Sequence, residues 1–178
     1  FAHTPQDGLT MLTLLDALQP VGLARVVLDS VSLWPQLGAL ASVEPMASLQ
    51  VLERDGYREL GTVLALVGQG RDGDLAARIT IKHDSGQVVK VSVPAGTIQC
   101  VPLGPDEEVS IEVRPSRAFD VGLGEKGAGG KARVRGGNLG LVIDTRGRPL
   151  ALPHDERYRR LKRQEWLRNL GGDVQRPS

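Results

Sequence analysis

Residues 75–94, LAARITIKHDSGQVVKVSVP, decide the fold. In the first half, apolar residues ending in Ile79 and Ile81 alternate with polar ones, and in the second half valine recurs at every other position from Val89 to Val93. Alternation with a period of two is typical of strands that bury one face. The polar HDSG between the two halves therefore predicts a β-hairpin with a four-residue loop.

The same alternation continues toward the C-terminus. It recurs at 109–114 and 131–135, and short apolar runs occupy 62–67, 97–101 and 139–143. About seven short strands broken by glycine and proline are typical of a sandwich or a barrel. Each has one apolar and one polar face, as antiparallel sheets do. We therefore predict an α+β fold dominated by an antiparallel β sandwich or barrel.

The first 55 residues follow a different pattern. Apolar positions spaced as on one helix face predict a helix over 8–19, and the uninterrupted apolar run LARVVLD, 23–29, predicts a strand buried on both faces. Short helices are predicted over 32–41 and 44–53. The expected apolar face of the first helix consists of Met11, Leu14, Leu15 and Leu18. Helix, strand and helices in this order predict a small α/β segment, residues 1–55, ahead of a β domain, residues 56–152.

A basic helix and tail, residues 153–178, complete the predicted organisation. Asp155 is a plausible N-cap, and Gly171-Gly172 ends the helix. The helix has six cations, and we expect Tyr158, Leu161 and Trp166 to dock it on the β domain. The alternative is a nucleic-acid-binding module that uses this basic helix.

Bulk composition excludes several classes of protein. The 22 Lys and Arg against 21 Asp and Glu leave a net charge of +1, which gives no reason to expect nucleic acid or a membrane surface as partner. A single cysteine, Cys100, rules out an internal disulfide and fits a cytoplasmic protein. The chain opens at Phe1 without methionine, so we expect a piece of a longer protein.

The stretch GLGEKG, 122–127, matches the G-x-G-x-x-G pattern of dinucleotide-binding loops. In such loops a helix follows, and its N-terminus holds the pyrophosphate. Here a period-two segment follows instead, so we interpret the glycines as a flexible connection between strands. The alternative is a phosphate- or ligand-binding loop over 122–131, with Lys126 or Lys131 as the point charge.

The turn DTRGRP, 144–149, is the most distinctive short motif. Arg146 and Arg148 flank a glycine and could bind a carboxylate or phosphate bidentately, or they could pair with acids of the same domain. With Lys126 and Lys131 they are the candidate anion or partner contacts. Histidines are scattered, and Cys100 lies in a strand-like run, so we predict no metal site, no cofactor site and no catalytic residue.

One family resemblance covers nearly the whole chain. GGNLGLVIDTRGRPLALPHDERYRRLKRQEWLRNLG, 136–171, resembles the C-terminal end of the MutL-type proteins encoded beside glutamate mutase, a family unrelated to the mismatch-repair protein of similar name. FDVGLG, 119–124, and LLDALQPVGLARVVLDSVSLWPQLGALA, 14–41, fit the same pattern.

This resemblance implies a role in an assembly. Family members look like accessory or reactivating chaperones for adenosylcobalamin-dependent mutases, with an actin/hexokinase-like ATPase in the N-terminal part. Residues 1–55 would then be the end of that ATPase-like domain, and ATP and Mg²⁺ would belong to the missing part. The implied function is a non-catalytic interaction module whose partners are a mutase and the protein's own N-terminal region.

Overall fold

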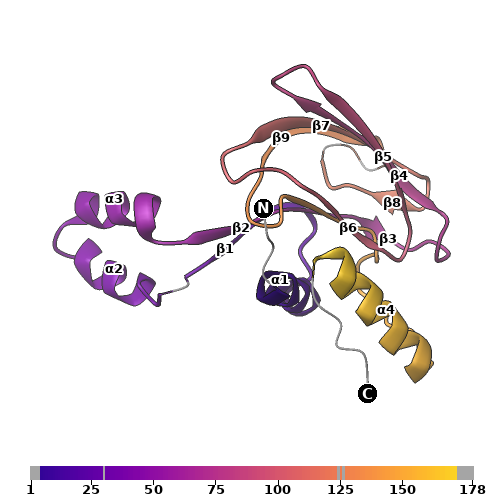
Figure 1. Ribbon diagram of the computed structural model, residues 1–178, viewed down its shortest axis with the longest axis horizontal. Coiled ribbons are helices and arrows are strands. Elements are labelled where there is room, and N and C mark those ends of the chain that lie inside the picture. Colours follow the sequence, from indigo (N-terminus) through magenta and orange to yellow (C-terminus); the bar gives the residue numbers. More distant parts are fainter. Residues whose placement is uncertain (1–4, 30, 124, 126, 172–178) are drawn as a thin grey trace.

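The structure is a computed structural model and describes residues 5–29, 31–123, 125 and 127–171. Two four-stranded sheets pack face to face, and two helices, α1 (Pro5–Leu18) and α4 (Glu156–Asn169), cover the outer face of one of them (Figure 1). The α+β class predicted from the sequence is confirmed.

The first sheet is mixed and has the strand order β1-β2-β10-β6. Its strands are β1 (Gly22–Leu28), β2 (Arg58–Ala65), β6 (Ile98–Val101) and β10 (Leu141–Asp144). β10 runs parallel to β2 and antiparallel to β6, and all four β10 residues are buried. The expectation that 23–29 would be buried on both faces is wrong. β1 is an edge strand and only partly buried, whereas β2 and β10 occupy the centre of the sheet.

The second sheet is antiparallel and has the strand order β5-β4-β7-β9. Its strands are β4 (Leu75–His83), β5 (Val88–Pro94), β7 (Glu108–Pro115) and β9 (Gly130–Arg135). The hairpin predicted over 75–94 is confirmed, with Ile79 opposite Val91 and a loop at 84–87. At its start, however, a register shift buries Ala76 and leaves Leu75 37% exposed.

Of the two architectures left open by the sequence, the structure shows the sandwich. The described strands form two open sheets, plus the short pair β3 (Val67–Gly68) and β8 (Phe119–Asp120), and do not close into a barrel. Apolar side chains from both sheets fill the space between them. This core includes Leu64, Leu66, Ile79, Ile81, Val109, Ile111, Leu141 and Ile143.

A second core lies between the first sheet and the two helices. Met11, Leu12 and Leu15 of α1 pack there with Trp166 and Leu170 at the C-terminal end of the chain. The helices approach closely at Gly8, where a Cβ would lie 2.5 Å from the carbonyl oxygen of Leu170. The predicted apolar face of α1 is therefore partly wrong: Leu12 is buried, and Leu18 is 72% exposed beyond the edge of this core.

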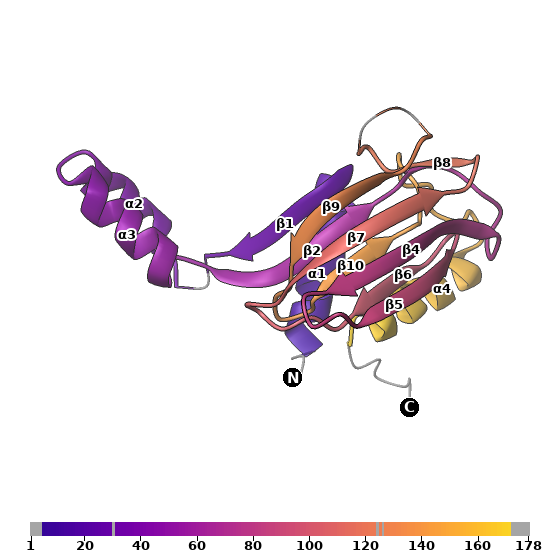
Figure 2. The same ribbon diagram turned by 90° about the horizontal axis from the view of Figure 1, so that it is seen from above.

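Helices α2 (Trp34–Ala41) and α3 (Pro45–Asp55) form a hairpin inserted between β1 and β2. The hairpin stands away from the sandwich and from α1 and α4 (Figures 1 and 2). Asp29 starts it by accepting hydrogen bonds from the backbone amides of Leu33 and Trp34. The predicted boundary at residue 55 falls at the end of α3. Strands β1 and β2, which lie on either side of this boundary in the sequence, pair with each other in one sheet.

None of the helices in the described part of the chain has both the length and the hydrophobicity that a membrane crossing requires.

Close backbone packing at Gly140 gives a direct test of the sheet arrangement. Gly140 has a φ of +76°, and a Cβ there would lie 2.3 Å from the carbonyl oxygen of Val101. Gly86 has a similar φ of +86° with nothing within 4 Å of a built Cβ. We expect Gly86→Ala to lower the free energy of unfolding by about 1 kcal/mol. Gly140→Ala should cost about 3 kcal/mol, because overpacking adds to the backbone strain.

Urea unfolding followed by circular dichroism measures both losses. Equal losses in the two variants would mean that the backbone of β6 and its following residues does not lie against Gly140.

Candidate functional site

The glycine-rich loop is closed by a carboxylate of its own chain. It connects β8 to β9, and its described residues contain no helix start. Asp120 accepts a hydrogen bond from the backbone amide of Gly122 through Oδ1 and from that of Gly127 through Oδ2, both at 2.7 Å. In a phosphate-binding loop such amides face the anion. Here a protein carboxylate already occupies two of them, which favours the interpretation as a strand connection.

The three candidate cations that the structure describes do not come together in one site. Lys126 lies outside the described residues. Lys131 is exposed on β9, where its Cα partner in the neighbouring strand is Glu112. Arg146 and Arg148 lie at the end of β10 in a different part of the fold, and both are buried.

The turn after β10 is organised around Asp144, which is fully buried. Arg146 donates to it from Nε at 3.0 Å and from a terminal nitrogen at 2.9 Å, and Arg148 donates at 2.7 Å. The backbone amide of Arg146 adds a fourth hydrogen bond at 3.0 Å. Pairing with acids of the same domain, the alternative that the motif left open, is therefore what the structure shows for both arginines.

The two guanidinium groups also reach beyond Asp144. Arg146 donates to Asp16 of α1 at 2.6 Å and lies 4.7 Å from the ring centroid of Trp166 of α4. Arg148 donates to the carbonyl oxygen of Pro20, between α1 and β1, at 3.2 Å. Burial by itself would raise the pKa of Asp144, but the hydrogen bonds and charges of the two arginines outweigh burial and lower it. This network, Asp16–Arg146–Asp144–Arg148, joins both helices to the central strand and is a structural centre.

Replacing Asp144 by asparagine leaves buried guanidinium groups without their shared anion. We expect Asp144→Asn to lower the free energy of unfolding at neutral pH by about 3–5 kcal/mol. Asp106→Asn is the matched control, because Asp106 pairs with Arg135 through a side chain that is 92% exposed, and it should change little.

The pH dependence of this loss has a defined sign. Since folding lowers the pKa of Asp144, its contribution is complete above the unfolded-state value of about 4 and is lost as pH falls through the lower folded-state value. Wild type and Asp144→Asn should therefore converge in acid. A gap that stays constant down to the acid transition would contradict the ion-pair network.

Polar contacts fix α4 on the sandwich. Tyr158 donates its hydroxyl to Asp72, Lys162 bridges the same carboxylate at 2.8 Å, and Trp166 Nε1 donates to the carbonyl oxygen of Gly96 at 2.9 Å. The N-cap role predicted for Asp155 is confirmed by its hydrogen bond from the amide of Tyr158. The docking prediction is correct for Trp166 and Tyr158 and wrong for Leu161, which is 61% exposed.

The described histidines and the cysteine belong to no cluster of potential metal ligands among the described residues. No group of three or more metal-binding side chains occurs among the described residues, which exclude His3. His83 Nδ1 lies 2.7 Å from a carboxylate oxygen of Glu107. The thiol of Cys100 donates to the carbonyl oxygen of Leu139, and burial raises its pKa to about 12.

The raised pKa of Cys100 predicts an unreactive thiol. At about pH 8 the native thiolate fraction should be about a thousandfold below that of the unfolded chain, where the pKa returns to its ordinary value. Ellman's reagent with and without guanidinium chloride measures the two rates. Fast labelling of the native protein would place Cys100 at an accessible surface.

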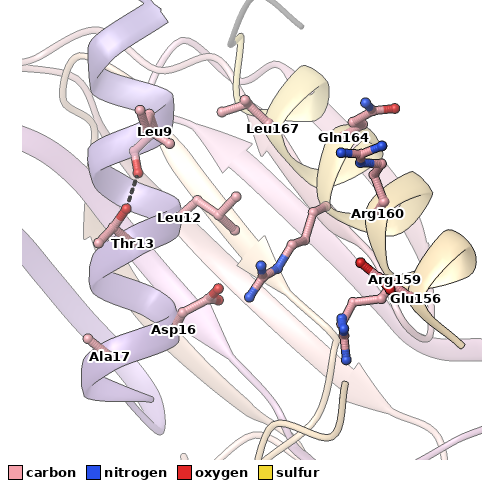
Figure 3. A pocket seen from close by; sticks show the side chains of 11 residues that line it. Leu9, Leu12, Thr13, Asp16, Ala17, Glu156, Arg159, Arg160, Gln164 and Leu167 are labelled. Atoms are coloured by element: carbon pink, nitrogen blue, oxygen red, sulfur yellow. Dashed lines mark hydrogen bonds between the residues drawn. The ribbon is translucent and has the colours of Figure 1, made fainter. Parts of the chain in front are cut away.

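A first open surface is a groove between α1 and α4 (Figure 3). Its volume is about 780 Å³. α1 contributes Leu9, Leu12 and Asp16 to its lining, and α4 contributes arginines and Leu167.

The second open surface is the α2–α3 hairpin. Among its helical residues only Leu37 and Ser48 are buried, and the Ser48 hydroxyl donates to the carbonyl oxygen of Leu37. Six large apolar side chains in and beside the two helices are exposed: Val31 70%, Trp34 43%, Val43 76%, Met46 65%, Leu49 46% and Val51 36%. Between residues 31 and 52 the only charged residue is Glu44. This near absence of charge is the sequence feature that identifies the exposed apolar surface of the hairpin. Patterns of catalytic and anion-binding residues do not reveal it.

Comparison of the chain with protein-family models, with curated proteins and with solved structures finds no match.

Proposed function

We propose that this chain is a non-catalytic interaction module and that the α2–α3 hairpin is its docking element. The observation that carries the proposal is a helical hairpin that stands away from the body (Figure 2). Six large apolar side chains in and beside its helices are exposed. Contiguous apolar patches on soluble domains mark interaction sites.

The hairpin has the features of a docking element. Met46 and Leu49 lie one turn apart on α3, and both are exposed. Trp34 opens α2 with its indole nitrogen donating to the carbonyl oxygen of Gly56 at 2.6 Å, which fixes the ring while leaving it 43% exposed. Aromatic and aliphatic anchors of this kind dominate binding energy in protein interfaces. Their burial against a partner provides the driving force, since the hairpin has few charges to contribute.

The partner class comes from the family resemblance. An adenosylcobalamin-dependent mutase such as glutamate mutase is the proposed external partner, and an ATPase-like N-terminal region is the proposed internal one. ATP and Mg²⁺ are assigned to that region. A phosphate site in residues 122–131 has less support, because Asp120 already accepts hydrogen bonds from two amides of that loop.

A paired-variant binding experiment tests the proposal. Met46→Glu combined with Leu49→Glu places two charges on the exposed face of α3, and Val88→Glu places a charge on a 50% exposed residue of β5 as the control. We expect biolayer interferometry against purified glutamate mutase to show at least a tenfold loss of affinity for the hairpin variant, because charged side chains resist desolvation. The control should bind like wild type, and all three proteins should have similar melting temperatures.

Two kinds of result would contradict the proposal. The first is a binding result in which the hairpin variant binds like wild type or none of the proteins binds. The second is micromolar binding of MgATP to the chain in isothermal titration calorimetry, which would contradict the non-catalytic assignment.

A further inference from the structure

The groove between α1 and α4 has a cationic wall. Arg159, Arg160 and Arg163 of α4 line it, and in the described part of the chain their side chains make no hydrogen bond or ion pair. Lys162 of the same helix differs, since it pairs with Asp72 at 2.8 Å and with Glu165 at 3.3 Å. Lys162 therefore forms ion pairs within the chain, whereas the guanidinium groups of the three arginines are available to bind an anion.

Acids of the groove do not neutralise this wall. The lining contains Asp16 and Glu156. Asp16 projects from α1 toward α4, and Arg159 and Arg160 extend from α4 (Figure 3). The Asp16 carboxylate already accepts from the buried Arg146 at 2.6 Å. Three arginines thus face one uncommitted acid, Glu156, and the groove has an excess of positive charge.

Most of the remaining groove lining is aliphatic, and its polar members are Thr13 and Gln164. Leu9 is 54% exposed, Ala17 and Leu167 continue the surface between the helices, and Leu12 lines it although only 8% of that residue is exposed. The Thr13 hydroxyl donates to the carbonyl oxygen of Leu9 at 2.9 Å, so it is satisfied within its own helix. Among the described residues, none that lines the groove has an aromatic side chain, and nucleic-acid bases are bound mainly by stacking on aromatic rings.

We propose that this groove binds an acidic amphipathic helix of a partner protein. The aliphatic side chains would receive its apolar face, with anchors at i, i+3, i+4 and i+7, and the arginines would pair with flanking glutamate or aspartate. Charge complementarity and the aliphatic lining together select this occupant over a nucleic acid. The site is separate from the α2–α3 hairpin and does not depend on a mutase as partner, so it can succeed or fail independently of the proposed function.

A model peptide provides the probe. A fluorescein-labelled helical peptide with leucine at i, i+3, i+4 and i+7 and glutamate elsewhere is titrated with the full chain and followed by fluorescence anisotropy. A peptide with lysine in place of every glutamate is the charge control. We expect the glutamate peptide to bind with micromolar affinity, more weakly at high salt, and the lysine peptide not to bind.

Variants on both helices locate the site. Arg159→Ala with Arg163→Ala should weaken binding about tenfold, whereas Arg157→Ala with Arg168→Ala should leave it unchanged. The second pair removes the same charge from exposed positions of α4 outside the groove lining. Leu9→Glu should weaken binding by a similar factor, and Leu18→Glu, on an exposed α1 residue outside the lining, should not.

Several results would overturn the proposal. These are no binding of the glutamate peptide, equal binding of the lysine peptide, or equal losses in the groove variants and their controls. A 20-nucleotide poly-dT and vesicles containing phosphatidylserine are tested in the same way. If either binds more tightly than the glutamate peptide, and Arg159→Ala with Arg163→Ala abolishes that binding, the cationic wall belongs to a nucleic-acid or a membrane surface instead.

Discussion

The buried carboxylate of Asp144 is the constraint on which the arrangement of the body depends. It ends β10, the strand buried at the centre of the first sheet, and no solvent reaches it. A charge in that position is stable only if cations and hydrogen-bond donors surround it. Arg146 and Arg148 supply both, and they extend the same network to Asp16 of α1 and the ring of Trp166 of α4. Helices from the two ends of the chain are thereby fixed to one strand.

The molecule has two parts that differ in how they are held: a body, which contains the Asp144 network, and the α2–α3 hairpin. The body has two apolar cores, one between the sheets and one beneath the helices, and the Asp144 network lies at the edge of the second. The α2–α3 hairpin contributes to neither core. It is held by the paired strands β1 and β2, by Asp29 at its start and by its own few internal contacts. The surfaces that we propose for binding therefore lie on elements whose apolar side chains the fold leaves exposed.

The sequence predicted local structure well and long-range pairing poorly. Alternation over 75–94 determines a hairpin locally, and the structure confirms it. The apolar run 23–29 predicts a strand buried on both faces, but such a run does not reveal whether its strand lies at an edge or in the centre of a sheet, and β1 lies at an edge. Asp16 is 130 residues from Arg146 in the sequence, and no local pattern connects the two. From the sequence, therefore, an ion pair of Arg146 with an acid of the same domain is only an alternative to the binding of an external anion. Asp120, two residues before the first glycine of GLGEKG, is a local signal in the sequence that a carboxylate of the chain itself can accept hydrogen bonds from the amides of this loop.

Amide hydrogen exchange of the free protein can show whether the hairpin opens independently of the body, because it distinguishes local openings from global unfolding. We expect amides of β10, α1 and α4 to exchange only through global unfolding. Amides of α2 and α3 should exchange much faster, and they should become protected when a partner is bound. If the amides of α2 and α3 are as well protected from exchange in the free protein as those of β10, the hairpin is as firmly held as the body, and the proposed distinction between them is contradicted.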